Sequence, residues 1–157
     1  MTLSYQNLNK EFQGCLIHNM DSLTKEKRSW NMSHIKGKDT KYEILVRKAL
    51  FAEGFRFRKN VDNLPGKPDI VLSKYKTVVF INGCFWHQHA NCPNARIPKS
   101  NVDFWKQKLF RNVENDTKKQ ALLCQDGWNV VILWECELKK DFDGVIHSLF
   151  DTLRKSA

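Results

Sequence analysis

The chain has 157 residues, of which 41% are hydrophobic, so it can bury one core and does not require a second. Its 26 Lys and Arg outnumber its 17 Asp and Glu, and the net charge of +9 favours a polyanionic partner. No apolar stretch approaches the roughly 20 residues needed to span a bilayer. The first residues lack a secretory signal pattern, and five scattered cysteines argue against a disulfide framework. We therefore expect a protein of the reducing cytoplasm.

The amino-terminal quarter carries no clear hydrophobic period. Residues 1–24 are expected to form an arm that a partner orders, and residues 25–157 a single domain. Between Lys25 and Lys41, basic side chains surround Trp30, Met32 and Ile35. This composition fits a segment lying along a phosphate backbone, and equally a solvated basic leader.

A helix is predicted to begin after Asp39 or Thr40, either of which suits the N-cap, and to end at Gly54. Apolar residues recur within it at the spacing of a core-facing stripe: Tyr42, Leu45, Val46, Ala49 and Leu50. Glu43 lies off this stripe, so its position alone indicates a surface side chain.

The next segments read as strands. Residues 55–58 alternate apolar and basic side chains, and two prolines make residues 64–68 a loop. Residues 69–73 and 77–81 are predicted to form a hairpin that turns at 74–76. Residues 128–135 are too apolar for a half-exposed strand and are expected to be central in the sheet.

Two more helices are predicted on either side of that last strand. The first, which Gly127 stops, has its apolar positions at Val102, Trp105, Leu109, Val113, Thr117 and Ala121. The second is amphipathic and contains Phe142, Ile146, Leu149, Phe150 and Leu153. The order helix, three strands, helix, strand, helix indicates an α/β sheet covered by helices.

A cluster of soft metal ligands follows the strand at 77–81. The spacing Cys84-x4-His89-x2-Cys92 supplies three ligands that zinc prefers, and Cys136, just past the last strand, is the natural fourth. A Cys3His set is closed, so we expect a structural ion. The alternative is that the cysteines are buried thiols and His89 a surface residue.

A second group of residues suits phosphate chemistry. Asp69 opens one hairpin strand, and the other delivers Ile81 and Asn82 close by, a hard-ligand arrangement suited to Mg²⁺. His87 is left over by the zinc site and is open to a general acid or base role, unless it is itself the fourth zinc ligand. Asp116 lies on the same helix face as Asn112, where it could orient an imidazole.

These motifs, taken together and in this order, resemble the very short patch repair (Vsr) endonuclease family. The matching pieces are residues 31–32, 39–43, 64–69, 83–87, 104–105, 112–116 and 134–136. The resemblance implies a PD-(D/E)xK variant of the restriction-endonuclease-like fold, with a mixed sheet flanked by helices and a structural zinc site. It also implies Mg²⁺-dependent nicking on the 5′ side of the mispaired thymine in T·G mismatches, which arise when 5-methylcytosine deaminates.

The resemblance assigns a role to each matching residue. Asp69, His87, Asp116 and Glu43 correspond to active-site residues, with the Ile81 main-chain carbonyl as a second Mg²⁺ ligand. The zinc ligands correspond to Cys84, His89, Cys92 and Cys136, in agreement with the spacing. The residues that would enter the DNA base stack are Phe85, Trp86 and Trp105, with Met32 and Ile35 approaching from the other groove.

One difference from the family lies directly before Gly83. Family members carry Thr-His there, whereas this chain has Ile81-Asn82. Loss of the threonine is tolerable if only the main-chain carbonyl at that position holds the metal, since Ile81 also has one. Asn82 cannot shuttle a proton, although it can hold a metal-bound water.

Three alternatives remain open beside the mismatch endonuclease. One is a homing or other sequence-specific endonuclease of the same fold, and another is a non-catalytic zinc-containing DNA-binding protein. The third is a hydrolase that uses the Cys84 thiol with His87, which a closed zinc site would exclude. The expected setting is a monomer on double-stranded DNA in a bacterial cytoplasm, associated with the nucleoid and with other mismatch repair proteins.

Overall fold

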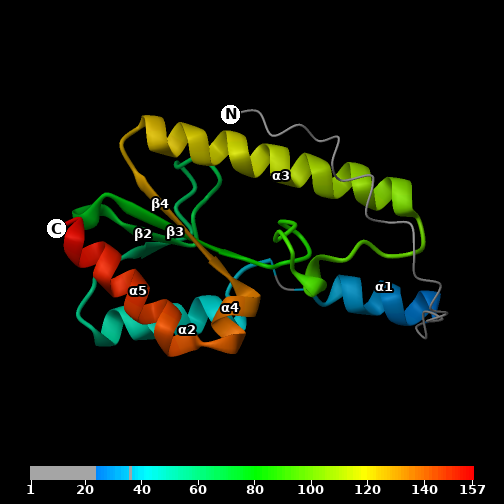
Figure 1. Cartoon of the computed structure of the whole chain (residues 1–157), viewed down its shortest axis with the longest axis horizontal. Helices are drawn as coiled ribbons and strands as arrows, with labels where there is room; N and C mark the ends of the chain where they lie inside the picture. The colour runs from blue at the N-terminus through cyan, green and yellow to red at the C-terminus, as the bar shows by residue number, and fades with distance from the viewer. Residues whose placement is uncertain (1–23, 36) are drawn as a thin grey trace. The chain divides into compact units, whose positions relative to one another are not determined.

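The computed structural model describes residues 24–35 and 37–157, and the chain divides into two compact units, 1–35 and 36–157. The described part of the first unit is helix α1 (Lys25–Ser33), shown in blue in Figure 1. Its N-cap is Thr24, whose Oγ1 accepts a hydrogen bond from the Lys27 N–H at 3.3 Å. This helix was not predicted. It buries no residue, so its sequence lacks the apolar period by which a helix is recognised. Residues 1–23 of the predicted arm lie outside the described residues.

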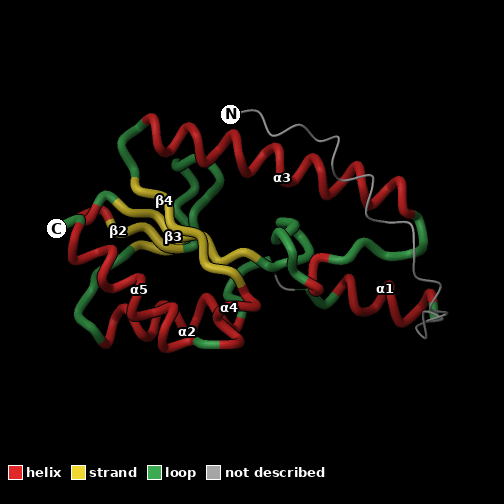
Figure 2. Tube along the Cα trace, viewed as in Figure 1, coloured by secondary structure: helices red, strands yellow, loops and turns green. Residues whose placement is uncertain are grey.

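The second unit is built on a mixed four-stranded sheet, drawn in yellow in Figure 2. The strands are β1 (Arg58–Lys59), β2 (Ile70–Leu72), β3 (Thr77–Asn82) and β4 (Asn129–Trp134), in that spatial order. β1, β2 and β3 are antiparallel neighbours, and β4 runs parallel to β3 from Thr77 opposite Asn129 to Asn82 opposite Trp134. The predicted hairpin is confirmed, and it turns through a short 3₁₀ segment (Ser73–Tyr75).

The strand predicted at 128–135 is present as β4, but its predicted central position was wrong, and so were the bounds of the strand predicted at 55–58. The strand expected at 128–135 lies at the edge of the sheet among the described residues and pairs only with β3. It is apolar because helices cover both of its faces. Phe55 and Phe57 precede the short β1 instead of forming it, and Phe55 is buried in the core.

Helices cover both faces of this sheet, as the sequence predicted (Figure 1). On one face lie α2 (Lys41–Ala52), α4 (Glu135–Lys140) and α5 (Phe142–Lys155), and on the other lies α3 (Val102–Gln125). The first core cluster joins Val46 and Leu50 of α2 to Leu149 and Leu153 of α5 beneath the sheet. No helix within the described part of the chain is long and apolar enough to cross a membrane.

The helical predictions differ from the structure in two places. The short α4 follows β4 directly and was not predicted. In α3, Leu109 and Leu123 are buried, but the predicted core positions Val102, Thr117 and Ala121 are exposed. Polar residues of α3 take up part of its inward-facing side, and this explains why an apolar stripe alone misjudged it.

Candidate active site and metal centre

The hairpin brings Asp69 beside the end of β3. Asp69 directly precedes β2, and because β2 and β3 are antiparallel, the start of one lies beside the end of the other. The Asp69 Oδ2 accepts a hydrogen bond from the Ile81 N–H at 2.7 Å. Asn82, the last residue of β3, is buried. The predicted proximity of Asp69 to Ile81 is therefore confirmed.

The Asp69 carboxyl is in an electrostatically costly position. Burial raises its pKa from the ordinary value of 3.8 to about 6, and the nearby Glu43 carboxylate acts in the same direction. The Ile81 N–H, Arg47 and His87 act against this rise. A partly buried carboxylate whose charge is incompletely balanced is suited to binding a cation, and oxygen ligands of this kind suit Mg²⁺.

His87 and Asp116 form a close pair. The His87 Nδ1 lies 2.5 Å from the Asp116 Oδ2, joining the loop after β3 to the middle of α3. Two further contacts fix the loop: the His87 N–H donates to the Gly83 carbonyl at 3.2 Å, and the Asn112 side-chain amide donates to the Trp86 carbonyl at 3.2 Å. With Nδ1–H directed at a carboxylate, the lone pair of the imidazole is left on Nε2.

Glu43 is buried, contrary to the expectation from its position on α2. Its Oε1 accepts from the Thr40 hydroxyl at 2.8 Å, and its Oε2 accepts from the Asp39 N–H at 2.9 Å. Thr40 is the N-cap of α2, and its Oγ1 accepts from the Glu43 N–H at 3.4 Å. The pair resembles a capping box in which the Glu43 carboxylate accepts the Asp39 N–H instead of the Thr40 N–H. The burial of Glu43 could have been expected from the spacing Thr40-x-x-Glu43, which predicts a carboxylate folded back over the start of the helix.

The four predicted zinc ligands converge. One ligand atom from each of Cys84, His89, Cys92 and Cys136 lies within 4.8 Å of the others. The His89 Nδ1 is 3.2 Å from the Cys136 Sγ and 3.8 Å from the Cys84 Sγ. Ligand atoms around a tetrahedral zinc stand about 3.5–4 Å apart, given metal–ligand bonds of about 2.0–2.3 Å. This group of residues therefore fits a metal ion such as zinc.

The surroundings of the cluster support that fit. Burial raises the pKa of the Cys84 thiol to about 12, so a metal's charge would be needed to keep its thiolate. At Cys92 burial acts in the same direction, but hydrogen bonds, led by the Asn94 N–H, outweigh it and lower the pKa. The His89 ring stacks on Trp134 with centroids 4.1 Å apart, which fixes its orientation.

An aromatic cluster lies beside the His87 loop. Phe85 contacts both Trp86 and Trp105, with ring centroids 5.1 and 5.4 Å apart. Phe104, which is 57% exposed, packs edge-on against Trp105, and the Lys108 ammonium lies 5.5 Å from the Trp86 ring centroid. The sequence analysis did not assign Phe104 or Lys108 to this cluster. Their positions one residue before and three residues after Trp105 on the same helix would have predicted that they lie beside it.

Met32 and Ile35 belong to the first unit. Both are exposed, at 41% and 49%, on or just after α1 in the first unit. Their predicted contact with DNA stays a prediction.

Comparison with known proteins gives a consistent answer. A family model described as DNA mismatch endonuclease Vsr matches residues 20–93. A type II nicking enzyme of Neisseria meningitidis, V.NmeAIP, is 56% identical over 119 residues, which cover 76% of this chain and 84% of that protein. V.XorIIP, a type II nicking enzyme of Xanthomonas oryzae, is 42% identical, covering 75% and 86%. The DNA mismatch endonuclease Vsr of Escherichia coli is 40% identical, covering 73% of each chain.

These relatives and the matching family model place the chain in the class of the DNA-nicking endonucleases. Within that class, the chain belongs to the Vsr DNA mismatch endonuclease family. This membership favours the enzymatic interpretation over a non-catalytic zinc module.

Proposed function

We propose that this protein is a Mg²⁺-dependent endonuclease that nicks DNA on the 5′ side of the mispaired thymine in a T·G mismatch. The observation that carries the proposal is that one end of β3 holds both the Asp69 carboxylate and the loop bearing the His87–Asp116 pair. We also propose that the mixed sheet is a PD-(D/E)xK variant of the restriction-endonuclease-like fold.

The metal would be held by the Asp69 carboxylate and the Ile81 main-chain carbonyl. When bound there, Mg²⁺ supplies charge neutralisation at the scissile phosphate and lowers the pKa of a bound water. The Asp69 carboxylate, fixed by the Ile81 N–H at 2.7 Å, contributes one preoriented oxygen ligand. Asn82, in the position where family members carry histidine, would hold a water by hydrogen bonds from its side-chain amide without transferring a proton.

His87 is the proposed general base. Asp116 accepts the Nδ1–H, which fixes the tautomer and leaves Nε2 to take a proton from the attacking water. The same contact stabilises the imidazolium that results. A positioned base of this kind contributes about 10²–10⁴-fold to the rate.

The aromatic cluster is the proposed mismatch reader. Phe85, Trp86 and Trp105 are in mutual contact and only partly buried, so their flat faces can stack on bases. Insertion between base steps costs less where pairing is already poor, and this favours a mismatch. Met32 and Ile35 would approach from the other groove, and the arm at residues 1–24 would contact the DNA.

We further propose that Cys84, His89, Cys92 and Cys136 hold a structural zinc. The ligand set is closed, with no position left for a substrate. Because Cys84 and His89 bracket residues 85–88, the ion would fix the loop that carries both the aromatic side chains and His87.

One other substrate preference has specific support. The relatives named type II nicking enzymes make a sequence-specific endonuclease the second candidate. In either case double-stranded DNA is the partner, and we expect a monomer that works with other mismatch repair proteins in a bacterial cytoplasm.

The test is a nicking assay on two duplexes that differ only in one pair, T·G against T·A. With Mg²⁺ present, we expect the T·G duplex to be nicked far faster, and omission of Mg²⁺ to stop the reaction while zinc is retained. Equal rates on the two duplexes would contradict mismatch specificity and favour the second candidate.

A further inference from the structure

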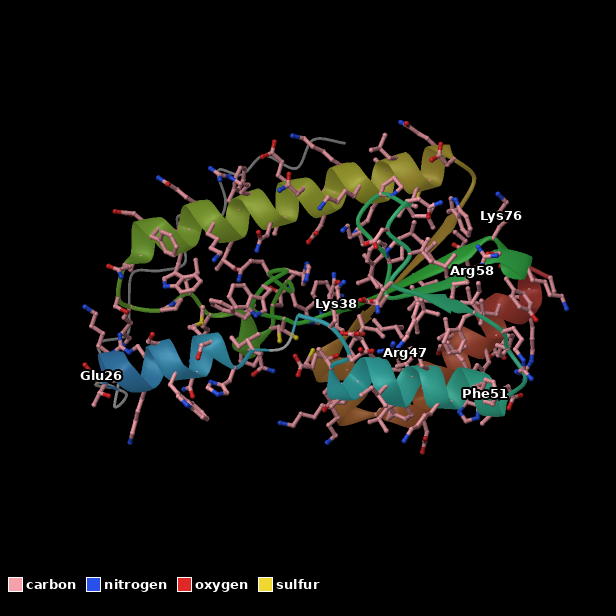
Figure 3. The ribbon with its side chains drawn as sticks, turned by 180° about the vertical axis from the view of Figure 1, so that it is seen from behind. Glu26, Lys38, Arg47, Phe51, Arg58 and Lys76 are labelled. Carbon is pink, nitrogen blue, oxygen red and sulfur yellow. The ribbon has the colours of Figure 1, made fainter. Side chains whose placement is uncertain are left out.

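Arg47 is a buried arginine that belongs neither to the proposed catalytic groups nor to the zinc ligands. It lies one turn after Glu43 on α2 (Figure 3) and is only 8% exposed. Its Nη2 lies 2.7 Å from the Asp39 Oδ1 and 3.3 Å from the Glu43 Oε2, and its Nε donates to the Glu43 main-chain carbonyl at 3.0 Å. A guanidinium is rarely buried unless it is paired in this way.

These contacts restrain the Glu43 side chain from several directions. Its carboxylate already accepts from the Thr40 hydroxyl and the Asp39 N–H, and Arg47 adds a charged donor to Oε2. Asp39 itself has a φ of 53°, a left-handed conformation that costs energy for a side chain other than glycine. The ion pair with Arg47 therefore supports both the strained residue and the carboxylate bound to it.

The charges explain why a cation is needed here. Glu43 and Asp69 are close enough for the Glu43 charge to oppose ionisation of Asp69, and Arg47 acts in the opposite sense. Lys59, 3.9 Å from the Asp39 Oδ1, and Lys38 are further cations that lower the pKa of Asp39. Arg47 is the buried one, and its planar fork reaches an acceptor on Asp39 and two on Glu43 where the point charge of lysine would reach fewer.

We propose that Arg47 is a positioning residue that holds the Glu43 carboxylate in the orientation at which it acts beside Asp69 in strand nicking. The inference rests on the proposed function, since it takes Glu43 as an active-site carboxylate. It goes beyond that function because it gives Arg47, a side chain outside the proposed site, a part in orienting Glu43. Arg47 itself contacts neither DNA nor metal in this account.

The chain supplies a matched control. Arg154 forms an ion pair with Glu53, just past the other end of α2, and both side chains of that pair are exposed. We expect Arg47→Met to slow single-turnover nicking of the T·G duplex at least about tenfold, since misplacing a catalytic group by 1 Å can cost about 10²-fold. The duplex concentration at half-saturation should stay within about twofold, whereas Arg154→Met should change neither quantity.

A double-mutant cycle with Glu43→Gln decides whether Arg47 acts through Glu43. If it does, adding Arg47→Met to Glu43→Gln should slow the reaction by no more than about twofold. The double variant also removes the uncompensated Glu43 charge, so the comparison stands even if Arg47→Met alone does not fold.

Three results would overturn the inference: an equal loss from Arg47→Met in both backgrounds, an Arg47→Met variant as fast as the unmodified protein, or a large change in half-saturation. A Glu43→Gln variant that nicks at full speed would also overturn it. The comparison of T·G with T·A duplexes uses the unmodified chain. A failure of the proposed function is therefore distinguished from a failure of the Arg47 inference.

Discussion

Three side chains in the proposed site come from three different elements. Asp69 directly precedes β2, His87 lies in the loop after β3, and Asp116 lies in the middle of α3. The sheet register fixes the first beside Ile81, and the 2.5 Å contact fixes the other two to each other. Each of these side-chain contacts can therefore be removed by one substitution.

Asp69→Asn should stabilise the protein at alkaline pH while abolishing nicking. The pKa of Asp69 is raised to about 6 in the folded state, above its ordinary value of 3.8. Above pH 6 the folded state therefore bears the cost of an ionised, partly buried carboxylate, on the order of 1–3 kcal/mol. As the pH falls from 6 towards 3.8 the folded carboxyl takes up its proton first, so most of the gain should be lost at pH 4. Urea unfolding at pH 8 and pH 4 without added Mg²⁺ measures this difference.

Asp62→Asn is the control for that measurement. Asp62 is an exposed carboxylate in the preceding loop, where a hydrogen bond from Lys67 holds its pKa below the ordinary value. Its substitution should bring no gain in stability at pH 8. If Asp69→Asn and Asp62→Asn changed stability alike, the assigned cost of burying Asp69 would be wrong.

Asp116→Asn should slow nicking with little effect on DNA binding. An amide can present its NH₂ group to the His87 Nδ1, which would favour the tautomer with its lone pair on the wrong nitrogen. We expect a loss of about 10²–10⁴-fold in the single-turnover rate, the range for removing a general base. Glu114→Gln on the same helix, where Glu114 pairs with Lys118 at the surface, should retain the unmodified rate. Similar rates for the two variants would remove His87–Asp116 from the mechanism.

At the scale of elements, the loop from Gly83 to Cys92 combines two tasks. Cys84, His89 and Cys92 are tied by Cys136 to the start of α4, while Phe85 to His87 are directed toward α3. Gln88 closes the loop by donating to the Phe85 carbonyl at 2.6 Å and to the Ala95 carbonyl at 3.2 Å. Any ion held there would therefore stabilise together the side chains proposed to read the mismatch and the histidine proposed to act in cleavage.

Cys136→Ser should release the metal and loosen that loop. A structural zinc is worth several kcal/mol, and each kcal/mol moves the melting temperature by about 2–4 °C in a domain of this size. We expect the zinc content to fall from one ion per chain, and the melting temperature to drop by on the order of 10 °C. Metal analysis and thermal unfolding measure the two quantities. Cys124→Ser, which removes an exposed thiol, should change neither. A Cys136→Ser protein that kept its zinc would contradict the assigned ligand set.

Some elements were predictable because their signals are local. The Thr40 cap, the hairpin at 69–81 and the ligand spacing from Cys84 to Cys92 depend on residues close in sequence. The edge position of β4 depends on which strands pair across the whole chain, and no local pattern carries that information. The burial of Glu43 was missed because its partners Asp39 and Arg47 make a charged side chain stable inside, which a hydrophobic stripe does not reveal.

At the scale of the whole molecule, the net charge of +9 and the family membership agree on a DNA partner. The pairing of His87 with Asp116, 29 residues apart, was expected only from the family resemblance. The geometry then brings together residues whose sequence positions alone gave no reason to connect them. The chain is therefore a DNA-nicking endonuclease of the Vsr family, and the T·G mismatch is its proposed substrate.

The most direct measurement maps the nick on a T·G duplex with Mg²⁺ present, for the unmodified protein and Asp69→Asn side by side. We predict a single cut on the 5′ side of the mispaired thymine for the unmodified protein and an intact duplex for the variant. A cut at another position, or a variant that cuts as fast as the unmodified protein, would contradict the account.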